Sequence, residues 1–273
     1  MARSHVEFIQ VQNLPWLYRP DGRAERVLSV DPESGAKTVM VRYLAGYRAP
    51  ANPVDAGAEE FLVLDGTVTI DGIRHGRHAY GFLPRGSGLG KRQSRWGAVL
   101  LVFRHGRDDP DSAAGTAEPI ALDAAAMPWD VTPHDPQLAH LRLARKVLRL
   151  GPNDSGRTFL LCGLPYGVPV EPTLPAETHD HAEEMFMISG EMWSPEGPMR
   201  PGAYFYRPPG ILHGPHVSQT GFLQIMRSPG ANRIVTHWSA ERRPLPIGAP
   251  YAPVLPAGAP DSWRRPVRAA TCW

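Results

Sequence analysis

The sequence contains an internal repeat, and this feature constrains the fold more than any other. Matching residues of the two halves are separated by 113 residues near the start and by 120 to 124 residues further along. An offset that changes only by loop-sized steps indicates two tandem copies of one structural unit. The matched pairs include Pro15-Trp16 with Pro128-Trp129, Val27-Leu28 with Val147-Leu148, Glu59-Glu60 with Glu183-Glu184, Gly66 with Gly190, and Gly86 with Gly210.

Each copy has the pattern of short strands joined by turns. Val27 to Val30 and Lys37 to Tyr43 are rich in Val and partly alternate, and residues 31–35 between them are typical turn residues. The chain has 27 Gly and 30 Pro, which suits many tight turns. Residues 135–150 permit either a capped helix or a strand, and the extended pattern of their counterpart favours the strand. The sequence therefore predicts an all-β protein.

The composition limits the classes of function. The 273 residues are 42% hydrophobic and 21% charged, with a net charge of +2, which indicates a packed globular chain and gives no basic block for nucleic acid. The longest apolar run, Ala98 to Phe103, is far too short to span a bilayer. The two cysteines form no CxxC motif, and residues 1–12 do not resemble a signal peptide. We expect a cytoplasmic protein that binds neither nucleic acid nor membranes.

Histidines and carboxylates gather in the second copy. His179 and His181, read as strand residues, point to one face because side chains alternate with a period of two. Glu183 or Glu184 follows them, and His213 follows a Pro-Pro-Gly turn on what should be a neighbouring strand. Three imidazoles and one carboxylate form a binding site for a first-row transition metal.

These residues resemble the metal-binding pattern of the cupin superfamily, in which an HxH pair, a Glu that begins a strand ending in Gly, and a PxGxxH histidine bind one metal. The matching residues, in order, are His179, His181, Glu183, Gly190 and His213. Only Ala182 separates the pair from Glu183, where the family has three or four residues. Glu183 precedes Gly190 by seven residues, as in the family, and is preferred to Glu184.

The first copy carries a second resemblance. Residues 59–66, EEFLVLDG, are similar to the cupin portion of zinc-binding anti-sigma regulators. Together the resemblances imply a bicupin, related to those regulators and to cupin dioxygenases, with two tandem double-stranded β-helix (jelly-roll) barrels. We place an N-terminal cupin module at 1–110, a metal-binding module at 119–240 and a Pro-rich tail at 241–273, with a linker near 108–118.

The first copy has lost the candidate ligands. Asp55 and Gly57 stand where the second copy has His179 and His181, and Leu89 stands where it has His213. One remaining carboxylate does not hold a metal. We therefore expect one divalent transition metal per chain.

Family resemblance also suggests a function. The resemblance implies a non-haem Fe(II) dioxygenase that acts on a small oxygen-chelating organic substrate, with Tyr206 and His216 as candidate catalytic residues. Zn, Mn or Ni in the same site would serve an isomerase, decarboxylase or hydrolase. A metal-binding sensor of a small ligand is the non-enzymatic alternative. A homodimer is expected.

Overall fold

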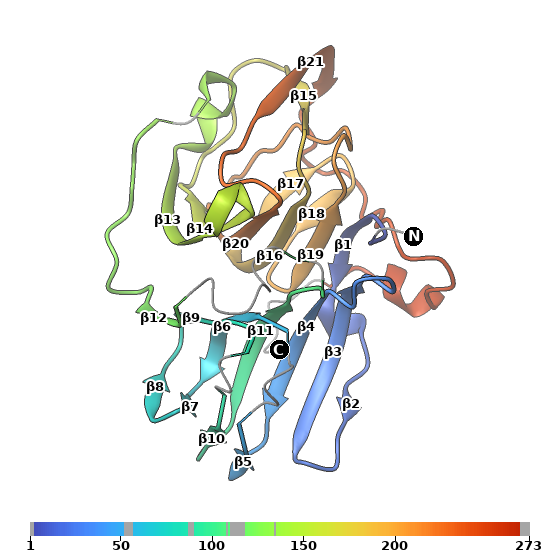
Figure 1. Cartoon of the computed structure of the whole chain (residues 1–273). Coiled ribbons are helices and arrows are strands. Elements are labelled where there is room, and N and C mark those ends of the chain that lie inside the picture. The colour runs from blue at the N-terminus through green and yellow to red at the C-terminus, as the bar shows by residue number, and fades with distance from the viewer. Residues whose placement is uncertain are drawn as a thin grey trace. The chain divides into compact units, whose positions relative to one another are not determined.

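The chain folds into two compact units, described here from a computed structural model. The described residues are 3–51, 57–86, 90–107, 109, 118–133 and 135–267. The first unit consists of Met1–Arg3 and Leu14–Met127, and the second of Ser4–Asn13 and Pro128–Trp273. Most of the expected linker, 108–118, lies outside the described residues. Figure 1 shows that strands dominate both units.

Within the described part of the first unit, two antiparallel sheets enclose an apolar core. One sheet has the order β12-β9-β6-β11-β4-β3-β2, and the other has the order β5-β10-β7-β8. Val39, Val41 and Leu100 of the first sheet and Val68 of the second are at most 1% exposed and pack in one cluster. The strands are β2 (Leu17–Tyr18), β3 (Arg23–Val30), β4 (Lys37–Tyr43), β5 (Tyr47–Ala49), β6 (Glu59–Gly66), β7 (Val68–Ile70), β8 (Ile73–His75), β9 (Ala79–Leu83), β10 (Arg92–Ser94), β11 (Ala98–Arg104) and β12 (Ile120–Asp123).

The second unit repeats this arrangement. Its main sheet has the order β1-β19-β16-β20-β14-β13, and two smaller sheets pair β15 with β21 and β17 with β18. Met185, Met187 and Phe205 of the main sheet pack with Phe8 and Met199 in the core. The strands are β1 (Val6–Gln10), β13 (Leu143–Leu150), β14 (Gly156–Gly163), β15 (Thr173–His179), β16 (Glu183–Gly190), β17 (Met192–Ser194), β18 (Gly197–Met199), β19 (Ala203–Arg207), β20 (Phe222–Pro229) and β21 (Thr236–Pro244).

Within the described ranges, helical structure is limited to short 3-10 turns, and the all-β prediction is confirmed. The turns η1 (Val11–Asn13), η3 (Pro136–Leu141), η4 (Pro152–Asp154) and η5 (Asp261–Arg264) connect strands or lie in the tail. The ambiguous segment 135–150 contains both expected structures. Asp135 caps η3 by accepting a hydrogen bond from the Gln137 N–H, and β13 follows. No helix among the described residues is long and apolar enough to cross a membrane.

The first strand of each sequence repeat belongs to the compact unit that the other repeat forms. β1 pairs with β19 in the second unit, whereas β12 pairs with β9 in the first. The sequence division had assigned 1–110 to the first module and 119–240 to the second, so β1 and β12 lie on the other side of that division. The physical reason is that a lone strand needs a sheet edge to satisfy its backbone groups, and β19 and β9 each offer one.

The Pro-rich tail continues over the second unit as extended chain. After β21, the N–H of Glu7 donates to the carbonyl of Val254, and the Tyr251 hydroxyl donates to the carbonyl of Phe8. The tail therefore lies against β1.

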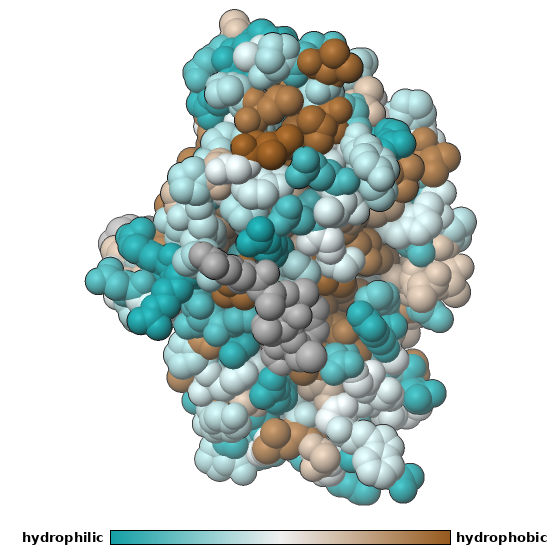
Figure 2. Space-filling view, turned by 180° about the vertical axis from the view of Figure 1, so that it is seen from behind, coloured by the Kyte–Doolittle hydropathy of each residue, from teal (hydrophilic) through white to brown (hydrophobic). Residues whose placement is uncertain are grey.

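Figure 2 shows apolar side chains gathered on the upper part of the face seen from behind, and the exposed apolar residues of the second unit include Val131, Val170 and Val235.

The placement of β1 predicts that the start of the chain stabilises the second unit. The Phe8 side chain is fully buried and packs against Phe205, with ring centroids 6.5 Å apart. Phe8→Ala should lower the free energy of unfolding by about 3–5 kcal/mol, because it leaves a cavity in the core. Urea denaturation followed by circular dichroism measures this loss. Tyr18→Ala, which removes a side chain that is 66% exposed, is the matched control. Equal stability of the two variants would contradict the assignment.

Candidate metal centre

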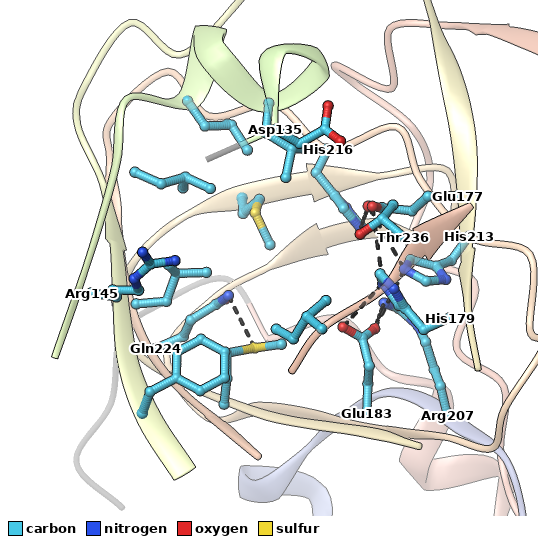
Figure 3. Close-up of a pocket in the computed structure, with 18 of the residues that line it drawn as sticks. Asp135, Arg145, Glu177, His179, Glu183, Arg207, His213, His216, Gln224 and Thr236 are labelled. Carbon is cyan, nitrogen blue, oxygen red and sulfur yellow. Dashed lines mark hydrogen bonds and ion pairs between the residues drawn. The ribbon is translucent and has the colours of Figure 1, made fainter. Parts of the chain in front are cut away.

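The second unit contains a cavity of about 460 Å³. Apolar side chains that include Phe159, Phe222 and Met226 line much of it. At one side, carboxylates and imidazoles point toward one another (Figure 3). These are Glu177, His179, Glu183 and His213, each at most 6% exposed.

The strands bring these four residues together. Glu177 and His179 lie two apart in β15 and therefore share a face. The backbones of Glu177 and His213 exchange two hydrogen bonds, of 2.9 and 3.0 Å, which places their side chains side by side. Glu183 is the first residue of β16. Its carboxylate oxygens lie 3.2 Å from His179 Nε2 and 3.4 Å from His213 Nε2.

The hydrogen bonds of the two histidines fix which ring nitrogen faces the carboxylates. Nδ1 of His179 lies 3.0 Å from the carbonyl oxygen of Val235, and Nδ1 of His213 lies 2.8 Å from that of Ile211. A carbonyl only accepts, so each Nδ1 carries a proton, and in the neutral form of either ring Nε2 is then bare. A bare nitrogen facing a carboxylate places two acceptors together. A cation bound between them would satisfy both.

The pKa shifts agree with a cation site. Burial and the neighbouring Glu183 carboxylate raise the pKa of Glu177 to about 8. Burial and Arg207 hold the pKa of His213 well below its ordinary value, which favours the neutral imidazole that binds a metal. A divalent cation favours ionised carboxylates and neutral imidazoles. The four residues therefore fit a first-row transition metal.

Glu183, rather than Glu184, faces the histidines. Glu184 points to the other face of β16, where its carboxylate accepts a hydrogen bond of 2.5 Å from the Tyr204 hydroxyl. The first unit repeats this pair, because the Tyr80 hydroxyl donates to Glu60 at 2.5 Å. The second glutamate of each pair thus has a structural role in both units.

His181 lies beside the cluster but outside it. β15 ends at His179, so the strand alternation used to pair the two histidines does not extend to His181. The rings of His179 and His181 stack with centroids 5.3 Å apart. Among the described residues, the groups able to hold one ion are His179, Glu183 and His213, and Glu177, His213 and His216. The buried Nε2 of His181 has no hydrogen-bond partner.

Glu177 is a candidate ligand that the sequence interpretation does not include. Its signal was the spacing: three residues separate His179 from Glu183, which is the interval that the family pattern requires between its pair and its glutamate. Shifting the pair by two residues makes Glu177 its first member. Because His179 and His181 already match the HxH motif, the pair formed by Glu177 and His179 was not among the predicted ligands.

The two residues expected to be catalytic lie in different places. His216 lines the cavity, with its Nε2 4.0 Å from a carboxylate oxygen of Glu177. Burial and Arg207 lower its pKa to about 3, so the ring is neutral near pH 7. Tyr206 is not among the lining residues, whereas its neighbours Phe205 and Arg207 are. By strand alternation Tyr206 therefore points away from the cavity.

The first unit pairs the corresponding carboxylate with guanidinium groups. Arg92 donates to Glu59 at 2.5 Å, and Arg104 lies 3.3 Å from its other oxygen. Burial alone would raise the pKa of Glu59, but these two arginines lower it below its ordinary value. A fixed positive charge therefore occupies the place beside Glu59. Gly57 lies in the described part of this unit, and Asp55 and Leu89 lie outside it.

The fold and the site define a two-module protein of the cupin class with a candidate metal centre in the second module. The family model of the ChrR cupin-like domain matches residues 4–107 and 117–231. The chain therefore belongs to the family of ChrR cupin-like domains, and the prediction of two tandem cupin modules is confirmed. No curated protein sequence matches the chain.

Solved structures share the fold at low sequence identity. A Nostoc punctiforme protein described as a candidate dioxygenase has a TM-score of 0.72 at 20% identity, over 88% of this chain and 92% of that one. Protein Ylba from E. coli has a TM-score of 0.60 at 15% identity, over 86% and 93%. Two oxalate decarboxylase structures are each 13% identical in sequence to this chain. The first has a TM-score of 0.56, over 86% of this chain and 80% of that one. The second has a TM-score of 0.50, over 85% of this chain and 79% of that one. The second is from Bacillus subtilis, and its description names Mn(II) centres.

The opposite orientations of Glu183 and Glu184 predict different losses on substitution. Glu183→Gln should weaken metal binding by more than roughly 10-fold, because it removes a direct ligand charge. Glu184→Gln should leave metal binding intact and cost about 1–3 kcal/mol of stability through the Tyr204 hydrogen bond. Metal content after dialysis and thermal unfolding measure the two effects. The reverse pattern would show that the strand register is shifted by one residue.

Glu177 and His181 are distinguished by a second pair of variants. Glu177→Gln should lower metal affinity roughly 10- to 100-fold, because an amide replaces one of two carboxylates at the centre. His181→Gln should change it less. Competition with a chromophoric chelator measures both affinities. If only His181→Gln releases the metal, the HxH pair binds it as the family resemblance implies.

Proposed function

We propose that this chain is a metal-dependent cupin enzyme, and that its activity is that of a non-haem Fe(II) dioxygenase on a small oxygen-chelating organic substrate. The observation that carries the proposal is the convergence of Nε2 of His179, Nε2 of His213 and two buried carboxylates at the side of a mostly apolar cavity. Glu177, His179, Glu183 and His213 would hold one metal per chain.

A metal bound there supplies Lewis-acid polarisation of a chelated substrate and, in the case of iron, access to O₂ chemistry. The residues of the chain contribute the environment. Phe159, Phe222 and Met226 keep water away from the reacting groups, which protects reactive species from wasteful protonation. His216, neutral near pH 7 and with a buried Nδ1 that has no hydrogen-bond partner, can form a hydrogen bond with the substrate and orient it.

A second candidate is a non-redox reaction such as decarboxylation, isomerisation or hydrolysis. The fold likeness to oxalate decarboxylase, one description of which names Mn(II) centres, favours including it. A metal-binding sensor of a small ligand is the non-enzymatic alternative. Fold likeness alone does not choose among these functions.

Reconstitution of the metal-free protein with Fe(II), Mn(II), Ni(II) and Zn(II) tests the proposal. With catechols and diketones as substrates, only the Fe(II) form should turn over, and O₂ consumed should equal product formed. His213→Ala treated with Fe(II) is the control, and it should neither retain iron nor consume O₂. Equal turnover of the Zn(II) form without O₂ would replace the dioxygenase by a non-redox enzyme. Tight binding of a metabolite without turnover would favour the sensor.

A further inference from the structure

The side of the cavity away from the metal centre carries positive charge. Leu143 and Arg145 of β13, and Arg157, Phe159 and Leu161 of β14, line the cavity. Each set is spaced by two residues, so strand alternation directs them to one face. Figure 3 shows Arg145 on the opposite side of the cavity from Glu177, His179 and His213.

Arg157 lacks an acidic partner among the described residues. Its guanidinium lies 4.2 Å from the centre of the Phe159 ring, and its buried Nε has no hydrogen-bond partner. Arg145, in contrast, is paired with Asp130 at 2.8 Å. Burial and the charge of Arg145 lower the pKa of Arg157 below its ordinary value. A partly buried cation without a counter-charge is stabilised when an anion binds beside it.

Gln224 adds a second unsatisfied group to the same cavity. Its side chain is 3% exposed, and its amide N–H donates to the Met226 sulfur at 3.2 Å. Its buried carbonyl oxygen has no hydrogen-bond partner. A buried acceptor of this kind costs free energy unless a donor reaches it. A ligand in the cavity therefore gains by carrying an O–H or N–H group next to its apolar part.

We propose that the substrate of the metal centre is an organic acid whose carboxylate pairs with Arg157. This inference rests on the proposed function for the identity of the reacting end. The apolar body of the acid lies against Phe159, Leu161 and Phe222, and a hydroxyl or amine donates to Gln224. A cavity of about 460 Å³ suits a small organic molecule. A carboxylate is favoured over a neutral group because the planar guanidinium matches its two oxygens.

The test measures binding to the metal-free protein by calorimetry, with phenyllactate, phenyllactamide and phenethylphosphonate as probes. Phenyllactate should bind more tightly than its amide. Arg157→Gln should weaken phenyllactate binding roughly 10- to 100-fold, through loss of a charge-assisted hydrogen bond, and leave amide binding unchanged. Arg264→Gln, which alters a side chain that is 60% exposed, is the control and should bind as the unchanged chain does.

Several outcomes would overturn the inference. These are equal binding of acid and amide, absence of acid binding, unchanged acid binding by Arg157→Gln, and tighter binding of the phosphonate than of the acid. Metal retention and circular dichroism of Arg157→Gln should match those of the unchanged chain, which separates a lost contact from a lost fold. Binding of the acid through Arg157 in a protein that shows no metal-dependent turnover would keep this inference and refute the proposed enzyme.

Discussion

A buried carboxylate at the start of a central strand is the constraint on which both units depend. Glu59 begins β6 and Glu183 begins β16, and each is at most 6% exposed. An ionised carboxylate inside a protein requires a nearby positive charge. The first unit supplies this charge permanently with Arg92 and Arg104. The second unit places Nε2 of His179 and of His213 beside the carboxylate, with Arg207 3.4 Å away, and a metal bound there would add positive charge.

The two units therefore share the pair of buried glutamates at the start of a central strand. They differ in which groups lie beside the carboxylate of the first glutamate. Glu60 and Glu184 each accept a hydrogen bond from a tyrosine at the equivalent position, Tyr80 and Tyr204, so this pair is common to both units. At the offset of 124 residues, Arg92 is the counterpart of His216. A guanidinium in one unit thus corresponds to a neutral, cavity-lining imidazole in the other. This exchange supports the expectation of one metal per chain, because a fixed cation beside Glu59 repels a second one.

The repeat and the strand patterns were sufficient to predict the all-β fold and its two modules, because an offset and an alternation survive in the sequence itself. The exchange of β1 and β12 was not predictable, since strand pairing across the chain depends on which sheet edge is free. The same limit applied to the site. Glu183 and His213 were found from spacing, but Glu177 depends on where β15 ends and on its backbone pairing with His213. Tyr206 was expected at the site, but which face of β19 meets the cavity depends on the packing of the sheet, and Phe205 and Arg207 line the cavity instead.

The N-terminal strand also influences the candidate site, because its Glu7 binds Arg207. Arg207 is buried and lines the cavity, and it lies 3.4 Å from Glu183, close enough to become its permanent partner as Arg92 is for Glu59. Glu7 of β1 accepts two shorter bonds from the same guanidinium, of 2.6 and 3.1 Å, so Arg207 is shared between the two carboxylates. A guanidinium bound in this way to one carboxylate is less able to neutralise another. The Glu183 carboxylate therefore has only part of the guanidinium as its partner, and it also faces His179 and His213. The strand that joins the second unit from the start of the chain thus draws Arg207 toward Glu7, which weakens the ion pair at Glu183 beside the candidate metal centre.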